Sequence, residues 1–129
     1  MVITPPLKKP SDLKRHTLLH DESSDRAEGV PNWATWLKAA GAMHVDSRRG
    51  PVFGSIHLAI EAALAGHGVA MGVEPLVEHD LRSGRLVRPF ELKLPNAFSF
   101  WVVCQRKRAH DPIIRKFRNW LSDEADREC

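Results

Sequence analysis

The chain has 129 residues, of which 43% are hydrophobic and 27% are charged. This balance is typical of a globular domain with one core, and it excludes a disordered chain or an integral membrane protein. The formal net charge is +3 at pH 7, with seven histidines in addition. By itself, this small excess does not indicate a nucleic-acid partner.

No stretch approaches the roughly 20 consecutive apolar residues that a membrane-spanning helix needs. The N-terminal sequence MVITPPLKKPSDLKRH lacks the apolar core of a secretory signal. Cys104 lies in an apolar run and Cys129 is the last residue, so the two form neither a CxxC pair nor a disulfide framework. These features predict a cytoplasmic protein in a reducing compartment.

The first third of the chain predicts one strand and one helix. Residues 4–16 hold three prolines and few apolar residues, which indicates an irregular lead-in. Thr17–His20 is predicted as a short apolar strand, followed by a polar loop. Asn32 is a candidate N-cap for a helix that ends at Gly41. One face of this helix carries its large apolar residues, Trp33, Trp36 and Leu37.

The middle of the chain predicts a strand, a helix and a second strand. Met43–Val45 is a candidate strand. Ser55 is a candidate N-cap, and Gly66 fits the left-handed position after a helix. The short apolar run Gly68–Val73 predicts a strand that is buried on both faces. The helix between Ser55 and Gly66 has one apolar face, formed by Ile56, Ala59, Ile60, Ala63 and Leu64.

The last part of the chain continues the alternation of helices and strands. Pro75 suits the first turn of a helix that stops at Gly84. Arg85–Phe90 is a candidate edge strand, weakened by Pro89. Ala97–Lys107, with the run FSFWVV, is the strongest predicted strand. Asp111 and Pro112 begin a terminal helix with an apolar face of Ile113, Ile114, Phe117, Trp120 and Leu121. This order predicts an α/β architecture.

Neither a metal site nor a catalytic site is predicted. His16 and His20 flank a strand, and no cysteine or carboxylate stands at a zinc-binding spacing from them. Ser55 lacks the GxSxG motif of a nucleophile elbow, and no acid/base pair of carboxylates can be placed. The basic stretch Arg106–Arg118 is interpreted as the solvated face of an amphipathic helix, in preference to a nucleic-acid site.

Ser55 has two interpretations that are equally weighted and compatible. The first is that its side chain caps the helix that follows. The second is that it contacts a ligand, because the free N–H groups of a helix N-terminus bind anions. Ligands of open α/β sheets lie outside the carboxyl ends of the strands, where Ser55 is expected.

Five segments of the sequence resemble the C-terminal part of a LysR-type transcriptional regulator, and among these the glycine-cleavage activators. The resemblance covers about residues 4–125. The segments are LLHDE, WATWLKAAG, VDSRRGPVF, AIEAALAGHGVAMGVEPLVEHDLRSGRLVRPF and DPIIRKFRNWLSDEA.

The resemblance implies an incomplete α/β effector domain like the type 2 periplasmic binding proteins. Residues 1–97 would form the second subdomain, with the crossover at 1–4. Residues 98–129 would supply the last strand and helix of the first subdomain. The N-terminal winged helix-turn-helix of the family would be absent.

The implied function is the binding of a small-molecule effector, without enzymatic activity, metal or cofactor. The effector would be a carboxylate or another small anion. The chain would associate with itself or pair with a LysR-type regulator, contact DNA only through the missing domain, and bind no membrane. The alternative is a stand-alone interaction protein that pairs with a full-length regulator, or a non-functional remnant.

The same resemblance implies the ligand-binding residues. Phe53, Gly54 and Ser55 would form one wall of the pocket, and Met71 and Gly72 would form its floor. Thr4 and His20 are weaker candidates near the crossover. A small hydrolase that uses Ser55 and a histidine is a third, disfavoured alternative, since no base or oxyanion arrangement is visible.

Overall fold

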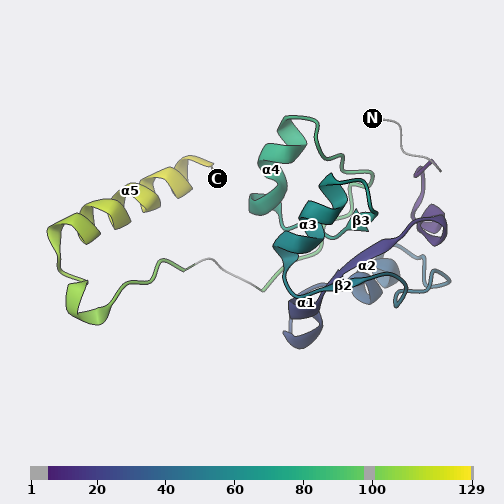
Figure 1. Ribbon diagram of the computed structural model, residues 1–129, viewed down its shortest axis with the longest axis horizontal. Coiled ribbons are helices and arrows are strands. Elements are labelled where there is room, and N and C mark those ends of the chain that lie inside the picture. The colour runs from purple at the N-terminus through teal and green to yellow at the C-terminus, as the bar shows by residue number, and fades with distance from the viewer. Residues whose placement is uncertain (1–5, 98–100, 129) are drawn as a thin grey trace. The chain divides into compact units, whose positions relative to one another are not determined.

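The computed structural model describes residues 6–97 and 101–128 (Figure 1). The chain divides into two compact units, Met1–Phe98 and Ser99–Cys129. In the described residues, no helix is long and apolar enough to cross a membrane.

The first unit is built on a three-stranded parallel sheet. Its strands are β1 (Leu18–Asp21), β2 (Val52–Phe53) and β3 (Val69–Ala70), in the order β2-β1-β3. β1 is therefore the central strand. His20 pairs with Val52 on one side, and Leu18 pairs with Val69 on the other. The predicted α/β architecture and the predicted first strand are confirmed.

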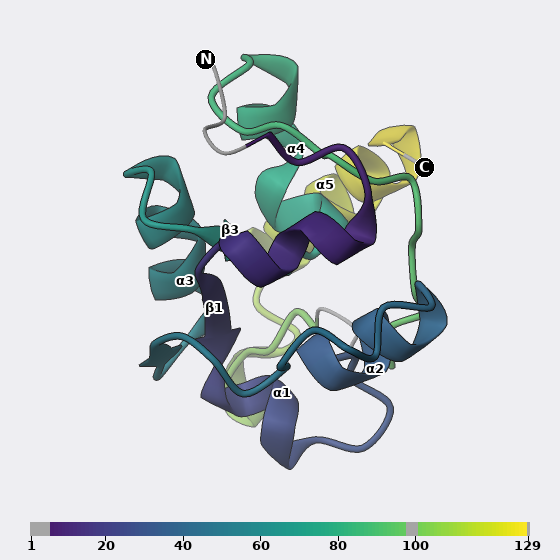
Figure 2. The ribbon, with the colours of Figure 1, turned by 90° about the vertical axis from the view of Figure 1, so that its right-hand side faces the viewer.

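Two helices cover the two faces of this sheet. The helix α3 (Ile56–Leu64) connects β2 to β3 and contacts all three strands, with Ala59 and Ile60 buried. The helix α2 (Trp33–Ala39) lies on the opposite side of β1 (Figure 2). Its buried side chains Trp33, Trp36 and Leu37 form the core together with Leu13, Leu18, Ala42 and Val45. The predicted apolar faces of both helices are confirmed.

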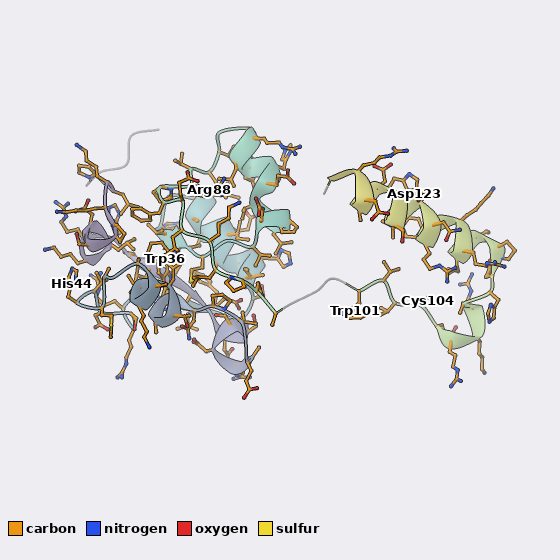
Figure 3. The ribbon with its side chains drawn as sticks, turned by 180° about the vertical axis from the view of Figure 1, so that it is seen from behind. Trp36, His44, Arg88, Trp101, Cys104 and Asp123 are labelled. Atoms are coloured by element: carbon orange, nitrogen blue, oxygen red, sulfur yellow. The ribbon has the colours of Figure 1, made fainter. Side chains whose placement is uncertain are left out.

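Trp36 connects α2 to the extended segment that follows the last helix of the first unit (Figure 3). Its ring centroid lies 5.4 Å from that of Phe90, and its indole N–H donates to the carbonyl oxygen of Leu92 at 3.3 Å. Arg85–Phe90 was predicted as an edge strand, and this prediction is wrong. The segment has no strand partner among the described residues. It is held by the ring contact of Phe90 and by the amide of Leu86, which donates to the carbonyl oxygen of Asp80.

The predicted helix boundaries are confirmed. Asn32 caps α2, since its side-chain oxygen accepts from the backbone N–H of Thr35 at 2.9 Å. Gly41 and Gly66 follow their helices with φ of +70° and +82°. The helix α4 (Glu74–Arg82) has Pro75 in its first turn and is followed by Gly84 with φ of +76°. These signals are local, so they can be read from short stretches of sequence.

The predicted strand Met43–Val45 is wrong. Ala42 and Val45 are buried, but the amide of Val45 donates to the carbonyl oxygen of Ala42 at 3.1 Å and closes a turn. The predicted strand Gly68–Val73 is reduced to the two residues of β3. It is only half-buried, because β3 lies at the edge of the sheet.

Three short elements of the first unit were not predicted. The lead-in contains a 3₁₀-helix, η1 (Pro10–Arg15). The polar loop after β1 begins with the helix α1 (Glu22–Arg26), which is capped by the carboxylate of Asp21. The third element is the short edge strand β2 itself. Apolar periodicity could not identify any of the three, because each is too short to repeat it.

The second unit contains η2 (Arg106–Arg108) and the helix α5 (Pro112–Glu128). Asp111 begins α5 as predicted, since its carboxylate accepts from the amide of Ile113 at 3.0 Å. Of the predicted strand Ala97–Lys107, residues Phe98–Phe100 lie outside the described residues. Residues 101–105 form no strand, and Trp101 is 82% exposed (Figure 3). A strand requires a hydrogen-bonded neighbour, and the described residues supply none here.

The carboxylate of Asp12 holds η1 together. It accepts from the amides of Lys8 and Lys9 at 3.0 and 3.1 Å and pairs with Arg15 at 2.9 Å. The two amides, followed by the guanidinium, lower the pKa of Asp12 below its usual 3.8. A carboxylate with a lowered pKa in the folded state stabilises the fold above its unfolded pKa, and this contribution is lost as the pH falls through the folded value.

Asp12→Asn should therefore flatten the acid limb of the stability curve. The wild-type chain should lose stability to urea as the pH falls below about 4, and the variant should lose less over the same range. Urea titrations at several pH values measure the difference, with Asp46→Asn as the control. Parallel curves for the wild type and Asp12→Asn would contradict the role of Asp12.

Gly50 lies directly against the central strand. Its φ is +101°, and a Cβ atom at this position would lie 1.9 Å from the carbonyl oxygen of Leu18. The segment before β2 can approach β1 this closely only because residue 50 has no side chain. Gly41 also has a positive φ, of +70°, but a Cβ atom there would meet nothing within 4 Å.

These two glycines form a matched pair for mutation. Gly41→Ala should cost about 1 to 2 kcal/mol, the penalty for left-handed backbone alone. Gly50→Ala should cost clearly more, because backbone must also move. Chemical denaturation of both variants measures the difference. Equal costs would show that the close approach to Leu18 is not a constraint.

Candidate functional site

Four of the predicted site residues directly follow the carboxyl ends of two strands. β2 ends at Phe53, which pairs with Asp21 at the end of β1, and Gly54 and Ser55 come next. β3 ends at Ala70, beside Leu19, and Met71 and Gly72 come next. Parallel strands present their carboxyl ends at one edge of the sheet, which is where ligands of open α/β sheets bind.

Ser55 occupies the N-cap position of α3 with an extended backbone, φ of −149°, and it is half-buried. Its hydroxyl makes no hydrogen bond to the helix. The predicted capping bond is therefore absent, although the helix begins where it was expected. The N–H groups of the first helical turn have no acceptor within the helix, so this helix end has donors available for a ligand.

Met71 and Gly72 each lie against a packing neighbour. Met71 is half-buried and packs against the core on the α2 side of the sheet. A Cβ atom on Gly72 would lie 3.1 Å from a methyl carbon of Val77. The absence of a side chain at residue 72 therefore lets the backbone pack closely against Val77 of α4. Thr4 lies outside the described residues.

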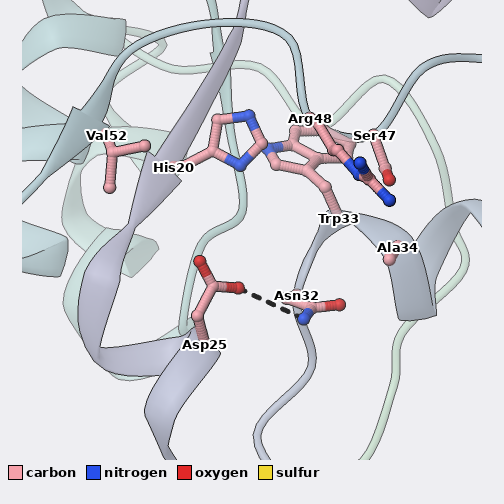
Figure 4. Close-up of a pocket in the computed structure, with 8 residues that line it drawn as sticks. All are labelled: His20, Asp25, Asn32, Trp33, Ala34, Ser47, Arg48 and Val52. Atoms are coloured by element: carbon pink, nitrogen blue, oxygen red, sulfur yellow. Dashed lines mark hydrogen bonds between the residues drawn. The ribbon is translucent and has the colours of Figure 1, made fainter.

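His20 lines a pocket of about 330 Å³ (Figure 4). Phe53, Gly54, Ser55, Met71 and Gly72 are not among the residues that line it. Adjacent residues of a strand point to opposite faces, so Val52 faces the pocket with its partner His20, whereas Phe53 faces the α3 side. The pocket is lined by His20, Asp25, Asn32, Trp33, Ala34, Ser47, Arg48 and Val52.

Hydrogen bonds hold His20 and the loop before β2 together. The backbone N–H of His20 donates to the carbonyl oxygen of Pro51 at 3.0 Å, and its Nε2 lies 2.6 Å from the carbonyl oxygen of Arg49. A carbonyl oxygen only accepts, so Nε2 carries a proton. The guanidinium of Arg49 donates to the carbonyl oxygens of Leu13 and His16, both at 3.1 Å. The loop is therefore fixed against β1 and η1.

Sequence reasoning identified only one residue of this pocket, His20, as a site residue. It assigned no role to Ser47 or Arg48. Asp25 comes from α1, which was not predicted. No local sequence signal placed this loop beside β1, because β2 was itself not predicted.

Known proteins resemble this chain over nearly its whole length. The family model described as the LysR substrate binding domain matches residues 4–126. The glycine cleavage system transcriptional activator of Escherichia coli (strain K12) is 35% identical over 123 residues, which are 95% of this chain and 38% of that protein. The transcriptional activator AmpR of Providencia stuartii is 33% identical, over 94% of this chain and 39% of AmpR.

Two solved structures show the same fold. The effector domain of AmpR from Pseudomonas aeruginosa aligns with a TM-score of 0.70 and 32% identity, over 93% of this chain and 55% of that one. The AmpR effector binding domain of Citrobacter freundii also gives 0.70, with 29% identity over 98% and 57%. The chain thus corresponds to a little more than half of those domains. Its relatives are transcriptional regulators, not enzymes. Because the family model covers nearly all of the sequence, the chain belongs to the LysR substrate-binding domain family, the effector-binding part of LysR-type transcriptional regulators.

Proposed function

We propose that this chain binds a small-molecule effector within a LysR-type transcriptional regulator. The observation that carries the proposal is the family match over residues 4–126. The chain spans 38% of the glycine cleavage activator, so DNA contact is assigned to another part of such a regulator. A protein that regulates transcription works beside the DNA, and the proposal therefore places it in the cytoplasm.

Within this proposal, the effector lies at the carboxyl edge of the sheet. Phe53, Gly54 and Ser55 form the wall, Met71 and Gly72 form the base, and Thr4 and His20 are peripheral. The uncapped helix α3 supports an effector with a carboxylate or another small anion, since the Ser55 hydroxyl and the first-turn N–H groups are donors. Residues 1–97 and 98–129 would belong to different subdomains, which the division near residue 98 supports.

Binding would act by shifting populations. A ligand changes the balance between two arrangements of a regulator only by its difference in affinity for them. An effector that contacts α3 in one arrangement and loses that contact in the other would favour the first. No chemical step on the effector is required.

Ser55→Ala should weaken the binding of a small carboxylate. Calorimetric titration with acetate, pyruvate and succinate should reveal at least one that binds, while its uncharged amide binds more weakly. Loss of a hydrogen bond to a charged group should weaken binding by roughly 10-fold or more. Melting should be unchanged, since the hydroxyl makes no capping bond, and Ser122→Ala is the control. Unchanged affinity in Ser55→Ala would exclude Ser55 from the site.

We also propose that the chain pairs with a second copy or with another LysR-type chain. Three large apolar side chains of α5, Ile113, Phe117 and Trp120, are 74%, 57% and 55% exposed, and the rings of the last two stack at 6.0 Å. A contiguous exposed apolar stripe of this kind is typical of an interaction surface.

Light scattering after size-exclusion chromatography tests this pairing. The wild-type chain should elute at twice the mass of one chain, and the Phe117→Ala/Trp120→Ala variant should elute as a monomer. Lys116→Ala on the same helix should behave as the wild type. A monomeric wild type at all concentrations would contradict pairing with a second copy. Co-purification with a full-length regulator would then test pairing with another LysR-type chain.

A further inference from the structure

The pocket beside His20 contains two opposite charges that do not pair with each other. Arg48 and Asp25 both line it, and they lie apart from each other among the lining residues (Figure 4). The backbone of Arg48 is fixed, because its amide donates to the carboxylate of Asp46 at 3.0 Å. Within the part of the chain that the structure describes, the guanidinium of Arg48 makes no hydrogen bond and no ion pair.

Asp25 is oriented but not neutralised. One oxygen of its carboxylate accepts from the side-chain N–H of Asn32 at 3.2 Å (Figure 4). The oxygen of the Asn32 side chain accepts in turn from the amide and hydroxyl of Thr35, both at 2.9 Å. The N-cap of α2 therefore holds the carboxylate in place. Among the described residues, no cation pairs with Asp25.

Apart from Ser47, the other walls of the pocket are apolar or already hydrogen-bonded. The indole N–H of Trp33 donates to the carbonyl oxygen of Leu19 at 2.9 Å, so Trp33 offers only aromatic surface. His20 uses its Nε2 on the loop carbonyl of Arg49. Ala34 and Val52 add apolar surface. The volume of about 330 Å³ lies at the lower end of the range of ligand pockets, which begins at roughly 300 Å³.

We propose that this pocket binds a free amino acid as its zwitterion. The carboxylate of the amino acid pairs with Arg48, whose guanidinium can hold it with two parallel hydrogen bonds. The ammonium group pairs with Asp25, and the side chain packs against Trp33 and Val52. A ligand with only one charge leaves the opposite charge of the pocket unpaired. The site lies on the face of the β1–β2 pair opposite to Phe53, and it goes beyond the function proposed above.

The test compares L-leucine and glycine with analogues that each lack one charge. Leucinamide and glycinamide lack the carboxylate, and the two N-acetyl amino acids lack the ammonium group. Calorimetric titration of the full chain should show binding of at least one of the two amino acids. Its two analogues should bind at least ~10-fold more weakly, the loss typical of one charge-assisted hydrogen bond. Equal binding of the analogues, or no binding of either amino acid, would overturn the proposal.

Two charge-removing variants assign the two charges. Arg48→Gln should remove the preference for the amino acid over its amide, while the preference over the N-acetyl form persists. Asp25→Asn should do the reverse, and it keeps an oxygen that can accept from Asn32. Lys38→Gln, an exposed change on α2, is the control. Circular dichroism checks that the variants fold. Unchanged preferences in both variants would refute the assignment.

Ser55→Ala separates this inference from the proposed function. The amino-acid titration should be unaffected by Ser55→Ala, because Ser55 does not line the pocket. Loss of amino-acid binding in Ser55→Ala would place the zwitterion at the carboxyl edge of the sheet and overturn the pocket assignment. If neither amino acid binds but a small carboxylate does, the pocket proposal fails and the proposed effector site at Ser55 stands.

Discussion

The central position of β1 is the constraint on which the first unit depends. Leu18 and Leu19 are 0% and 2% exposed, and as neighbours in a strand they point to opposite faces of the sheet. Burying both requires a helix on each side, and α2 and α3 provide these two layers. The strand must also be paired along both edges, which β2 and β3 accomplish with only two residues each. The positions of α2, α3, β2 and β3 around β1 follow from these requirements.

The loop before β2 packs directly against β1 and is hydrogen-bonded to it. Gly50 allows the backbone to approach Leu18 where any side chain would clash. Arg49 then connects the loop to Leu13 and His16, and His20 binds the loop in return. The pocket is therefore bounded by elements that are fixed to one another, which is the condition for a pocket that exists before its ligand arrives.

The two faces of the β1–β2 pair differ in chemistry. The α3 side presents the free hydroxyl of Ser55 and the donors of a helix end. The α2 side presents Arg48 and Asp25 around an aromatic wall. Strand alternation separates Val52 from Phe53, so adjacent residues serve different surfaces. In the two proposals, one short pair of strands supports a site for an anion and a separate site for a zwitterion.

The local features of the fold could be predicted from the sequence. Asn32, Gly41, Gly66, Pro75 and Asp111 act at helix ends through their own backbone preferences or through hydrogen bonds a few residues away. Apolar spacing identified the buried faces of α2 and α3, because a helix repeats within a short stretch. The sequence motifs also indicated the family, and the family match confirmed it.

The strands and the pocket were decided by tertiary structure. A strand forms only where a partner exists, so the strongly apolar residues 101–105 form none, whereas the two residues of β2 do. His20 and the loop that fixes it are 29 residues apart, and Asp25 and Arg48 line one pocket from different elements. No local pattern encodes such proximity, because it arises only when pairing along β1 sets which distant residues lie side by side.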